Sequence, residues 1–382
     1  MRSLLGALHR FWFSPASSSP LAAMRIVVCG YMLVSMLSYD LARTWRALKR
    51  PREFMDPAVA LDLFPLPYTL AAEWLLPLSL LVYGLGVLAT LGLFARPALF
   101  LFAACYWSMG AVIGAWGYIP HSRILPVQAL MILAFAPGTT AWSVDRLLQW
   151  AWRRRRGSAP PLRAALAGRP VPRWGIQLVL VIFATVMFSA GISKLRYSGW
   201  EWTDGRTLGF YLAGGSVRNV IIPDTGNGSR PGLDRRPHLS YWTDGFSQFV
   251  GRKDLTPDVA WKDGVGLESY LFSMTVQPMG RRVASHSSAV VALSFMSLFL
   301  ELLAPLMLVG SRLRSLYLLA ATGFFLGIDA TMGISFVPWV VVGLCLVDWR
   351  WLASPLLVRT GLLQRMRDRE RWRRPRRTAA QE

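Results

Sequence analysis

Long apolar stretches with almost no charged side chains limit what this sequence can fold into. Eight segments are apolar enough, and most are long enough, to cross a hydrocarbon layer about 30 Å thick as a helix of about 20 residues. They are residues 21–41, 70–94, 97–116, 121–136, 174–194, 288–309, 316–334 and 336–351, of which the fourth and the eighth are short. We therefore expect an all-α integral membrane protein, a polytopic bundle of about eight transmembrane helices.

Positive charge is concentrated in a few connecting segments. The formal net charge is +21, although only 16% of the residues are charged and 53% are hydrophobic. Much of the excess lies in the loop 138–173, which contains four consecutive arginines at 153–156, and in the tail 352–382. Cytoplasmic loops of membrane proteins are rich in Arg and Lys, whereas a nucleic-acid binder would carry a basic face on a soluble domain. The charge thus predicts sidedness and contact with membrane lipids, and we expect no nucleic-acid partner.

This charge distribution predicts a multi-pass protein of the cell membrane with both termini in the cytoplasm. The expected parts are a cytoplasmic N-terminal segment (1–20), a membrane domain with spans one to five (21–195), a folded external cap between spans five and six (196–287), spans six to eight (288–351) and the basic cytoplasmic tail (352–382). The basic loop 43–67 conflicts with this arrangement, because it would lie outside.

Two smaller patterns complete the organisation. The stretch WSVDRLLQWAW (142–152) predicts a short interfacial amphipathic helix with Ser143 as its N-cap. The three cysteines, Cys29, Cys105 and Cys345, lie far apart in apolar segments with no paired spacing. We therefore expect neither a disulfide framework nor a metal site.

Ionisable residues inside apolar segments cost free energy, so each is a candidate for a functional role. They are Arg25, Asp40, Glu73, His121, Lys194, Glu301 and Asp329. Snorkelling to lipid headgroups accounts for Arg25 and Asp40, which lie near the ends of the first segment. Glu301 lies deeper and needs a partner or a proton, either in a structural contact between helices or in a site.

His121 and Lys194 share a depth in this topology, since one begins the fourth segment and the other ends the fifth at the outer face. A lysine that an apolar wall desolvates is a usable base, and a histidine can orient a substrate or share protons with it. Ordinary snorkelling of Lys194 is the structural alternative.

Several motifs resemble a known family. The stretch FSAGISKL (188–195), followed by GWEWTDG and GFYL, resembles the membrane core of vitamin K-dependent gamma-glutamyl carboxylase. It is more similar still to the bacterial horizontally transferred transmembrane (HTTM) proteins, which carry an AG-x-x-K-L motif at a helix end. YIPHSRILPVQALMILAFAPGTTAWSVD and FLELLAPLML resemble the histidine-led helix and a later helix of that family, and the resemblance spans about residues 14–350.

The resemblance implies a function and a set of site residues. Lys194 matches the base that deprotonates reduced vitamin K, and His121 matches the histidine that assists it. A reduced quinone, either menaquinol or vitamin K hydroquinone, would occupy a pocket between spans four and five that opens outward. Trp200 and Glu301 are candidates for contacts with it. The implied chemistry is a lyase-type modification of a secreted peptide or protein, with no metal.

The chain also departs from the carboxylase. A basic tail follows the last span in place of a large lumenal domain, and the external region is enlarged around 222–262, where we expect any peptide to be recognised. A non-enzymatic membrane chaperone, immunity or assembly factor that binds a secreted partner through this loop is therefore the alternative. The enzyme hypothesis predicts that Lys194→Ala abolishes the modification and leaves folding intact.

Overall fold

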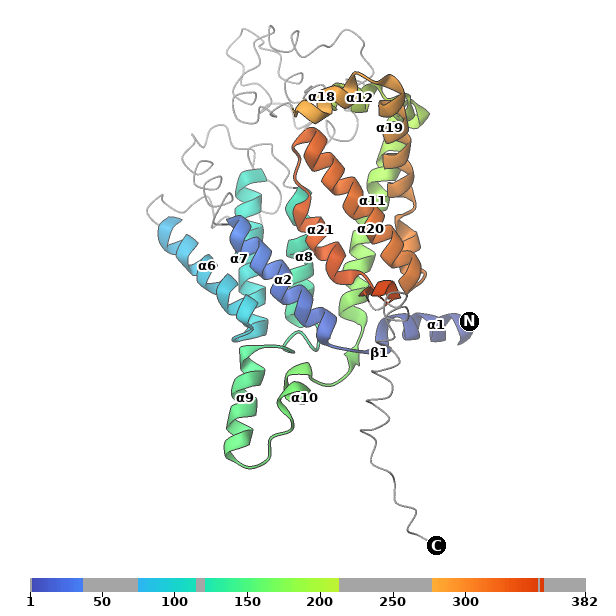
Figure 1. Ribbon diagram of the computed structural model, residues 1–382. Helices are drawn as coiled ribbons and strands as arrows, with labels where there is room; N and C mark the ends of the chain where they lie inside the picture. Colours follow the sequence, from blue (N-terminus) through green and yellow to red (C-terminus); the bar gives the residue numbers. More distant parts are fainter. Residues whose placement is uncertain (1, 37–74, 115–120, 213–276, 350, 354–382) are drawn as a thin grey trace.

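The computed structural model describes residues 2–36, 75–114, 121–212, 277–349 and 351–353 (Figure 1). This part of the chain is mostly helical. Its elements are α1 (Arg2–Phe13), β1 (Pro15–Ala16), α2 (Ser19–Ser35), α6 (Leu75–Leu91), α7 (Ala95–Gly114), α8 (His121–Phe135), α9 (Val144–Arg155), α10 (Leu162–Ala167), β2 (Val171–Pro172), α11 (Trp174–Ser198), the 3-10 helix η4 (Gly199–Asp204), α12 (Arg206–Leu212), α18 (Pro278–Ala284), α19 (Ser287–Leu302), the 3-10 helix η6 (Ala304–Leu308), α20 (Ser311–Met332) and α21 (Val337–Leu346).

Each of the eight apolar segments contains a helix, and these helices form one bundle. Helices α2, α6, α7 and α8 pack together, α11 packs on α8 and on α19, and α21 packs on α2, α8 and α20. Phe102, Phe183, Phe325 and Trp339 are buried where these helices meet. Large apolar side chains such as Phe299 are also exposed on the outside, as expected where lipid replaces water.

Two or three of these helices meet the length and apolarity of a membrane span in the described part of the chain. They are α11 and α20, with the pair α18–α19 as a third if the two helices, bent by 104°, count as one span. Helices α2, α6, α8 and α21 are apolar but shorter. Apolar helices are thus confirmed, whereas the full set of eight spans remains a prediction.

The N-terminal segment lies at the lower end of the bundle in Figure 1. Strands β1 and β2 pair antiparallel, and α1 lies beside this end, where the amide of Gln177 donates to the carbonyl of Phe11 over 3.2 Å. The predicted helix at 142–152 is confirmed as α9, and Ser143 caps it by accepting from the backbone N–H of Arg146. Helix α9 extends away from the lower end (Figure 1), and its place in a membrane interface stays a prediction.

The upper end of the bundle carries α12 and α18 (Figure 1), and η4 connects α11 to α12 there. Elements η4 and α12 follow α11, and α18 precedes α19, so this is the end at which the predicted external cap begins and finishes. Most of the cap, including the proposed recognition segment 222–262, lies outside the described residues, as does the basic loop 43–67.

Candidate functional site

Lys194 lies near the upper end of α11, one turn after Gly191. A Cβ atom built at Gly191 would lie 3.1 Å from the Cβ of Glu301 and 3.1 Å from a methyl carbon of Leu302. The missing side chain therefore lets α19 approach α11 closely at this level. Residues three apart share a helix face, so Lys194 projects toward the same part of α19. This geometry gives a physical reason for the AG-x-x-K spacing.

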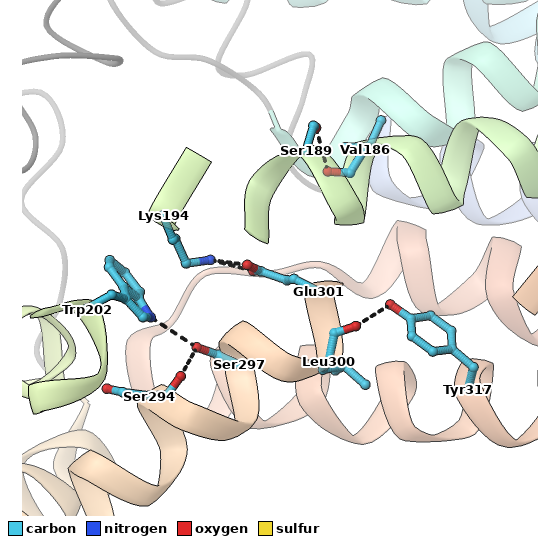
Figure 2. A network of polar contacts seen from close by, with 9 residues as sticks. All are labelled: Val186, Ser189, Lys194, Trp202, Ser294, Ser297, Leu300, Glu301 and Tyr317. Carbon is cyan, nitrogen blue, oxygen red and sulfur yellow. Dashed lines mark hydrogen bonds and ion pairs between the residues drawn. The ribbon is translucent and has the colours of Figure 1, made fainter. Parts of the chain in front are cut away.

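Lys194 and Glu301 form an ion pair between α11 and α19 (Figure 2). The Nζ atom lies 2.5 Å from each carboxylate oxygen, Oε1 and Oε2. The Lys194 side chain is 19% exposed and the Glu301 side chain 7%. Each charge removes part of the cost of burying the other, because an unpaired charge in this environment would be strongly unfavourable.

Trp202, on η4, completes the surroundings of the lysine (Figure 2). The Nζ atom lies 4.9 Å from the centre of the Trp202 ring, within the range of a cation–π interaction. The indole N–H donates to the hydroxyl of Ser297 over 3.4 Å, and that hydroxyl donates to the carbonyl of Ser294. The ammonium is thus held by a carboxylate and an aromatic face, both positioned by α19.

The neighbouring Trp200, predicted as a cofactor contact, has a different position. Its side chain is 66% exposed, whereas Trp202 is 7% exposed. The tight turn of η4 turns the second tryptophan of GWEW inward. Which tryptophan would contact a cofactor remains a prediction. Among the described residues, Trp202 is the tryptophan whose ring faces the Nζ atom of Lys194.

Glu301 belongs to a polar face of α19. Ser294, Ser297 and Glu301 are all buried, and their spacing places them on one side of the helix. On the neighbouring helix α20, the hydroxyl of Tyr317 donates to the carbonyl of Leu300 over 3.0 Å. The hydroxyl of Ser294 has no hydrogen-bond partner among the described residues. Buried polar side chains therefore follow one side of α19 from the ion pair toward the upper end of the bundle.

His121 begins α8 at the same end of the bundle as Lys194. A Cβ atom at Gly175, the second residue of α11, would lie 2.7 Å from the Cβ of Ala136, the residue after α8. The start of α11 therefore lies beside the end of α8, and the two packed helices run antiparallel. At a rise of about 1.5 Å per residue, His121 lies about 22 Å and Lys194 about 28 Å above that contact. The two residues are therefore about one turn apart in depth. The side chain of His121 is not described, so a contact between them remains a prediction.

Arg25 corrects one expectation from the sequence. Its side chain is 0% exposed and does not snorkel. It donates to the carbonyls of Thr139 and Trp142 over 2.8 and 2.9 Å, because the loop after α8 folds back over the start of α2. Asp40 and Glu73 lie outside the described residues, and Asp329 is partly buried near the end of α20.

Arg123 is a partly buried charge that the sequence analysis missed. It lies two residues after His121 on α8, and its guanidinium donates to the hydroxyl of Tyr106 over 2.8 Å. The arginine two residues after the histidine in the short motif HSRILP was the available signal. Within the described ranges, no group of three or more His, Cys, Asp or Glu side chains is arranged to hold a metal ion.

The comparisons with known proteins give one match. The family model of the HTTM domain matches residues 13–222, which is more than half of the chain. No curated protein and no solved structure matches this chain. The matched region contains His121, Lys194 and Trp202, and it ends before Glu301. The chain therefore belongs to the HTTM family and is a membrane protein of that carboxylase-related family.

Proposed function

We propose that this protein is a membrane enzyme that acts on a flat lipid at the outer face. The Lys194–Glu301 pair binds a hydroxyl group of this lipid and takes part in removing its proton. The lipid is a reduced quinone of the menaquinol or vitamin K hydroquinone class, and the reaction modifies a secreted peptide or protein. The observation that carries the proposal is the ion pair beside Trp202, in which Glu301 is buried and Lys194 is partly buried, since desolvated ionisable groups next to each other are candidates for proton-transfer sites.

The residues at this site fit a quinol. An ammonium can donate to a phenolic oxygen, a carboxylate can accept from a phenolic hydroxyl, and an indole can pack against a flat ring. Lys194 keeps 19% of its side chain accessible, so a hydroxyl can reach the pair. A bound quinol would supply the electrons for the reaction. The protein's own task would be to orient the hydroxyl and to hold its proton away from water.

His121 has a supporting role in this proposal. It lies at the same end of the bundle as Lys194 and about one turn from it in depth. An imidazole at that level can donate to a second oxygen of the lipid or exchange a proton with the external water. The proposal therefore places both residues at one mouth, between α8 and α11, which pack against each other.

The rival function is a non-enzymatic chaperone, immunity or assembly factor, in which the ion pair only joins two helices. The short contact to both oxygens fits that role as well. The two functions differ in what happens when both charges are removed together. A structural pair can be replaced by apolar side chains at little cost, and nothing else should then change.

The test is the quinone content of the protein purified in mild detergent. Wild type is compared with the double variant Lys194→Met/Glu301→Leu by organic extraction and mass spectrometry of the lipids. We expect wild type to carry a quinone and the double variant, equally stable in thermal unfolding, to lose it. The matched control is Asp204→Asn, which removes an exposed ion pair with Arg206 near the same site and should keep the quinone. Equal lipid content in all three proteins would favour the non-enzymatic function.

A further inference from the structure

We propose that a hollow at the upper end of the bundle, between α18, α19 and α20, binds the headgroup phosphate of an anionic membrane phospholipid. The hollow has a volume of about 710 Å³ and is lined by residues of all three helices and by Gln277, which precedes α18. At a rise of about 1.5 Å per residue, its lining residue Ala289 lies about 18 Å along α19 from Glu301. The hollow is therefore a second site, and the inference does not depend on the proposed function.

Helix α18 lies where a membrane surface would meet the bundle. Figure 1 shows it at the upper end, and it packs on both α19 and α20. A Cβ atom at Gly280 would collide with the carbonyl oxygen of Thr331, so the glycine lets the backbone of α18 lie directly on the last turn of α20. Helix α18 is bent by 104° from α19, and with α19 crossing a membrane it lies nearly parallel to the membrane surface. The hollow is thus placed at the level of the lipid headgroups.

Three polar side chains line the hollow, and each has a donor that suits a phosphate. Arg282 is exposed, and a guanidinium can donate two parallel hydrogen bonds to phosphate oxygens. A Cβ atom at Gly333 would lie 2.7 Å from Nε2 of Gln277, so the missing side chain leaves room for this amide and its two N–H donors. The Nδ1 atom of His286 lies 2.8 Å from the carbonyl oxygen of Arg282, which only accepts, so Nδ1 carries the proton. Its Nε2 is the ring atom left for a ligand, and it donates to an anion once the ring takes a second proton.

The charge around the hollow favours an anion. No Asp or Glu of the described chain is among its lining residues, and the adjacent Arg281 adds a second positive charge to α18. The salt bridges of the described residues join Lys194 to Glu301 and Arg206 to Asp204, so neither arginine of α18 takes part in one. Basic pockets between membrane helices are typical binding sites for phospholipid headgroups.

The rest of the hollow is apolar and continues into the outside of the bundle. Met279, Ala289 and Ala330 are part of its lining. Leu293 and Met296 follow Ala289 at helical spacing on the same side of α19, and both are exposed. An acyl chain of a lipid held at the hollow can therefore lie along this side of α19. A free phosphate ion or an acidic peptide would leave this apolar surface uncovered, so a phospholipid is the ligand that fits both parts.

The test measures hydrogen exchange of the α18 backbone amides in the full-length protein in neutral detergent, with palmitoyl-oleoyl phosphatidylglycerol added in steps. These amides report on the hollow and not on lipid bound at the basic lower end. Arg282→Gln removes the guanidinium that lines the hollow. Arg281→Gln is the matched control, because it removes the same charge from the neighbouring exposed position, which does not line the hollow. Ala330→Phe fills the apolar part and keeps both charges.

We expect phosphatidylglycerol to slow exchange at α18 in wild type. Arg282→Gln should raise the half-saturating amount of lipid about tenfold to a hundredfold, because charge-assisted hydrogen bonds are lost. Ala330→Phe should raise it as well, whereas Arg281→Gln should raise it about fivefold at most. All three positions are exposed, so the variants should unfold at the wild-type temperature.

Three results would overturn the inference. The first is that the lipid gives no protection at α18 in wild type. The second is an equal shift in the two arginine variants, which would mean that the charge of α18 alone attracts the lipid. The third is equal protection by sodium phosphate or by a hexaglutamate peptide at the same concentration, which would assign the hollow to a soluble anion or an acidic peptide. The quinone content of the protein is a separate measurement, so the proposed function survives each of these results.

Discussion

Two cations at opposite ends of the bundle, the buried Arg25 and the partly buried Lys194, are stabilised in different ways. Arg25, at the lower end, donates to two backbone carbonyls, those of Thr139 and Trp142. Gly92 has a φ of +73° beside it, and a Cβ atom there would lie 2.5 Å from the Arg25 guanidinium. Backbone carbonyls belong to a fixed loop and do not titrate, so this cation fastens the loop after α8 to α2.

Lys194, at the upper end, is held by a side chain. The carboxylate of Glu301 can rotate away, and it can take a proton. Because a side chain can change its rotamer and a backbone carbonyl in a fixed loop cannot, the proposed function requires an exchange of partners at Lys194 and none at Arg25. The comparison teaches that burial of a charge does not by itself indicate a site, since Arg25 is 0% exposed and only holds a loop in place.

The largest effect is expected at Arg25. Arg25→Met leaves two buried carbonyls without donors and removes two charge-assisted hydrogen bonds, each contributing about 1.5–3 kcal/mol. We expect the free energy of unfolding to fall by about 3–6 kcal/mol, measured by thermal and denaturant unfolding in detergent. Arg25→Lys should recover only part of this, since an ammonium lacks the guanidinium fork. A loss below about 1 kcal/mol would mean that the carbonyls find other donors and that the cation is not a fastener.

The Lys194–Glu301 pair should behave differently. Lys194→Ala leaves Glu301 buried without its partner and should cost about 2–4 kcal/mol, so we no longer expect this variant to leave folding intact. Lys194→Met/Glu301→Leu should unfold within about 1 kcal/mol of wild type, because both charges leave together. The coupling between the two positions, measured by a double-mutant cycle, would then be large. If the losses of unfolding free energy in the two single variants simply add in the double variant, the two residues do not stabilise each other. The contrast with Arg25 would then fail.

The sequence was sufficient for the helices but not for their contacts. Apolar segments in lipid must satisfy their own backbone hydrogen bonds, so helices in all eight segments could be predicted from composition. The position of Arg25 near the end of an apolar segment suggested a contact with lipid headgroups. Nothing in the neighbouring sequence shows that the loop near Thr139 folds back over this side chain. That contact joins residues 114 apart in the sequence.

The candidate site shows the same limit. Lys194 and Glu301 were each identifiable as costly charges in apolar segments, but their pairing spans 107 positions and depends on how α11 packs on α19. Two opposite charges in one membrane domain were the available clue. The choice between Trp200 and Trp202 depends on the turn of η4, which the motif GWEW does not specify.

The smallest of these effects is expected at the glycine that brings α11 and α19 together. Gly191→Ala puts a methyl group 3.1 Å from the Cβ of Glu301, which is too close for an unshifted contact, and overpacking of this kind costs about 1–3 kcal/mol. Gly323→Ala is the matched control, since nothing lies within 4 Å of its Cβ position on α20. It should be neutral or stabilise the helix by up to about 1 kcal/mol. Because Gly191 lies beside the Lys194 pair and far from Arg25, the added methyl should lower the quinone content of the purified protein. It should leave the lower end intact, which hydrogen-exchange protection of the backbone amides in the last turns of α8 would show. Equal loss of protection at both ends would mean that the bundle responds as one unit, and the contrast between its two ends would fail.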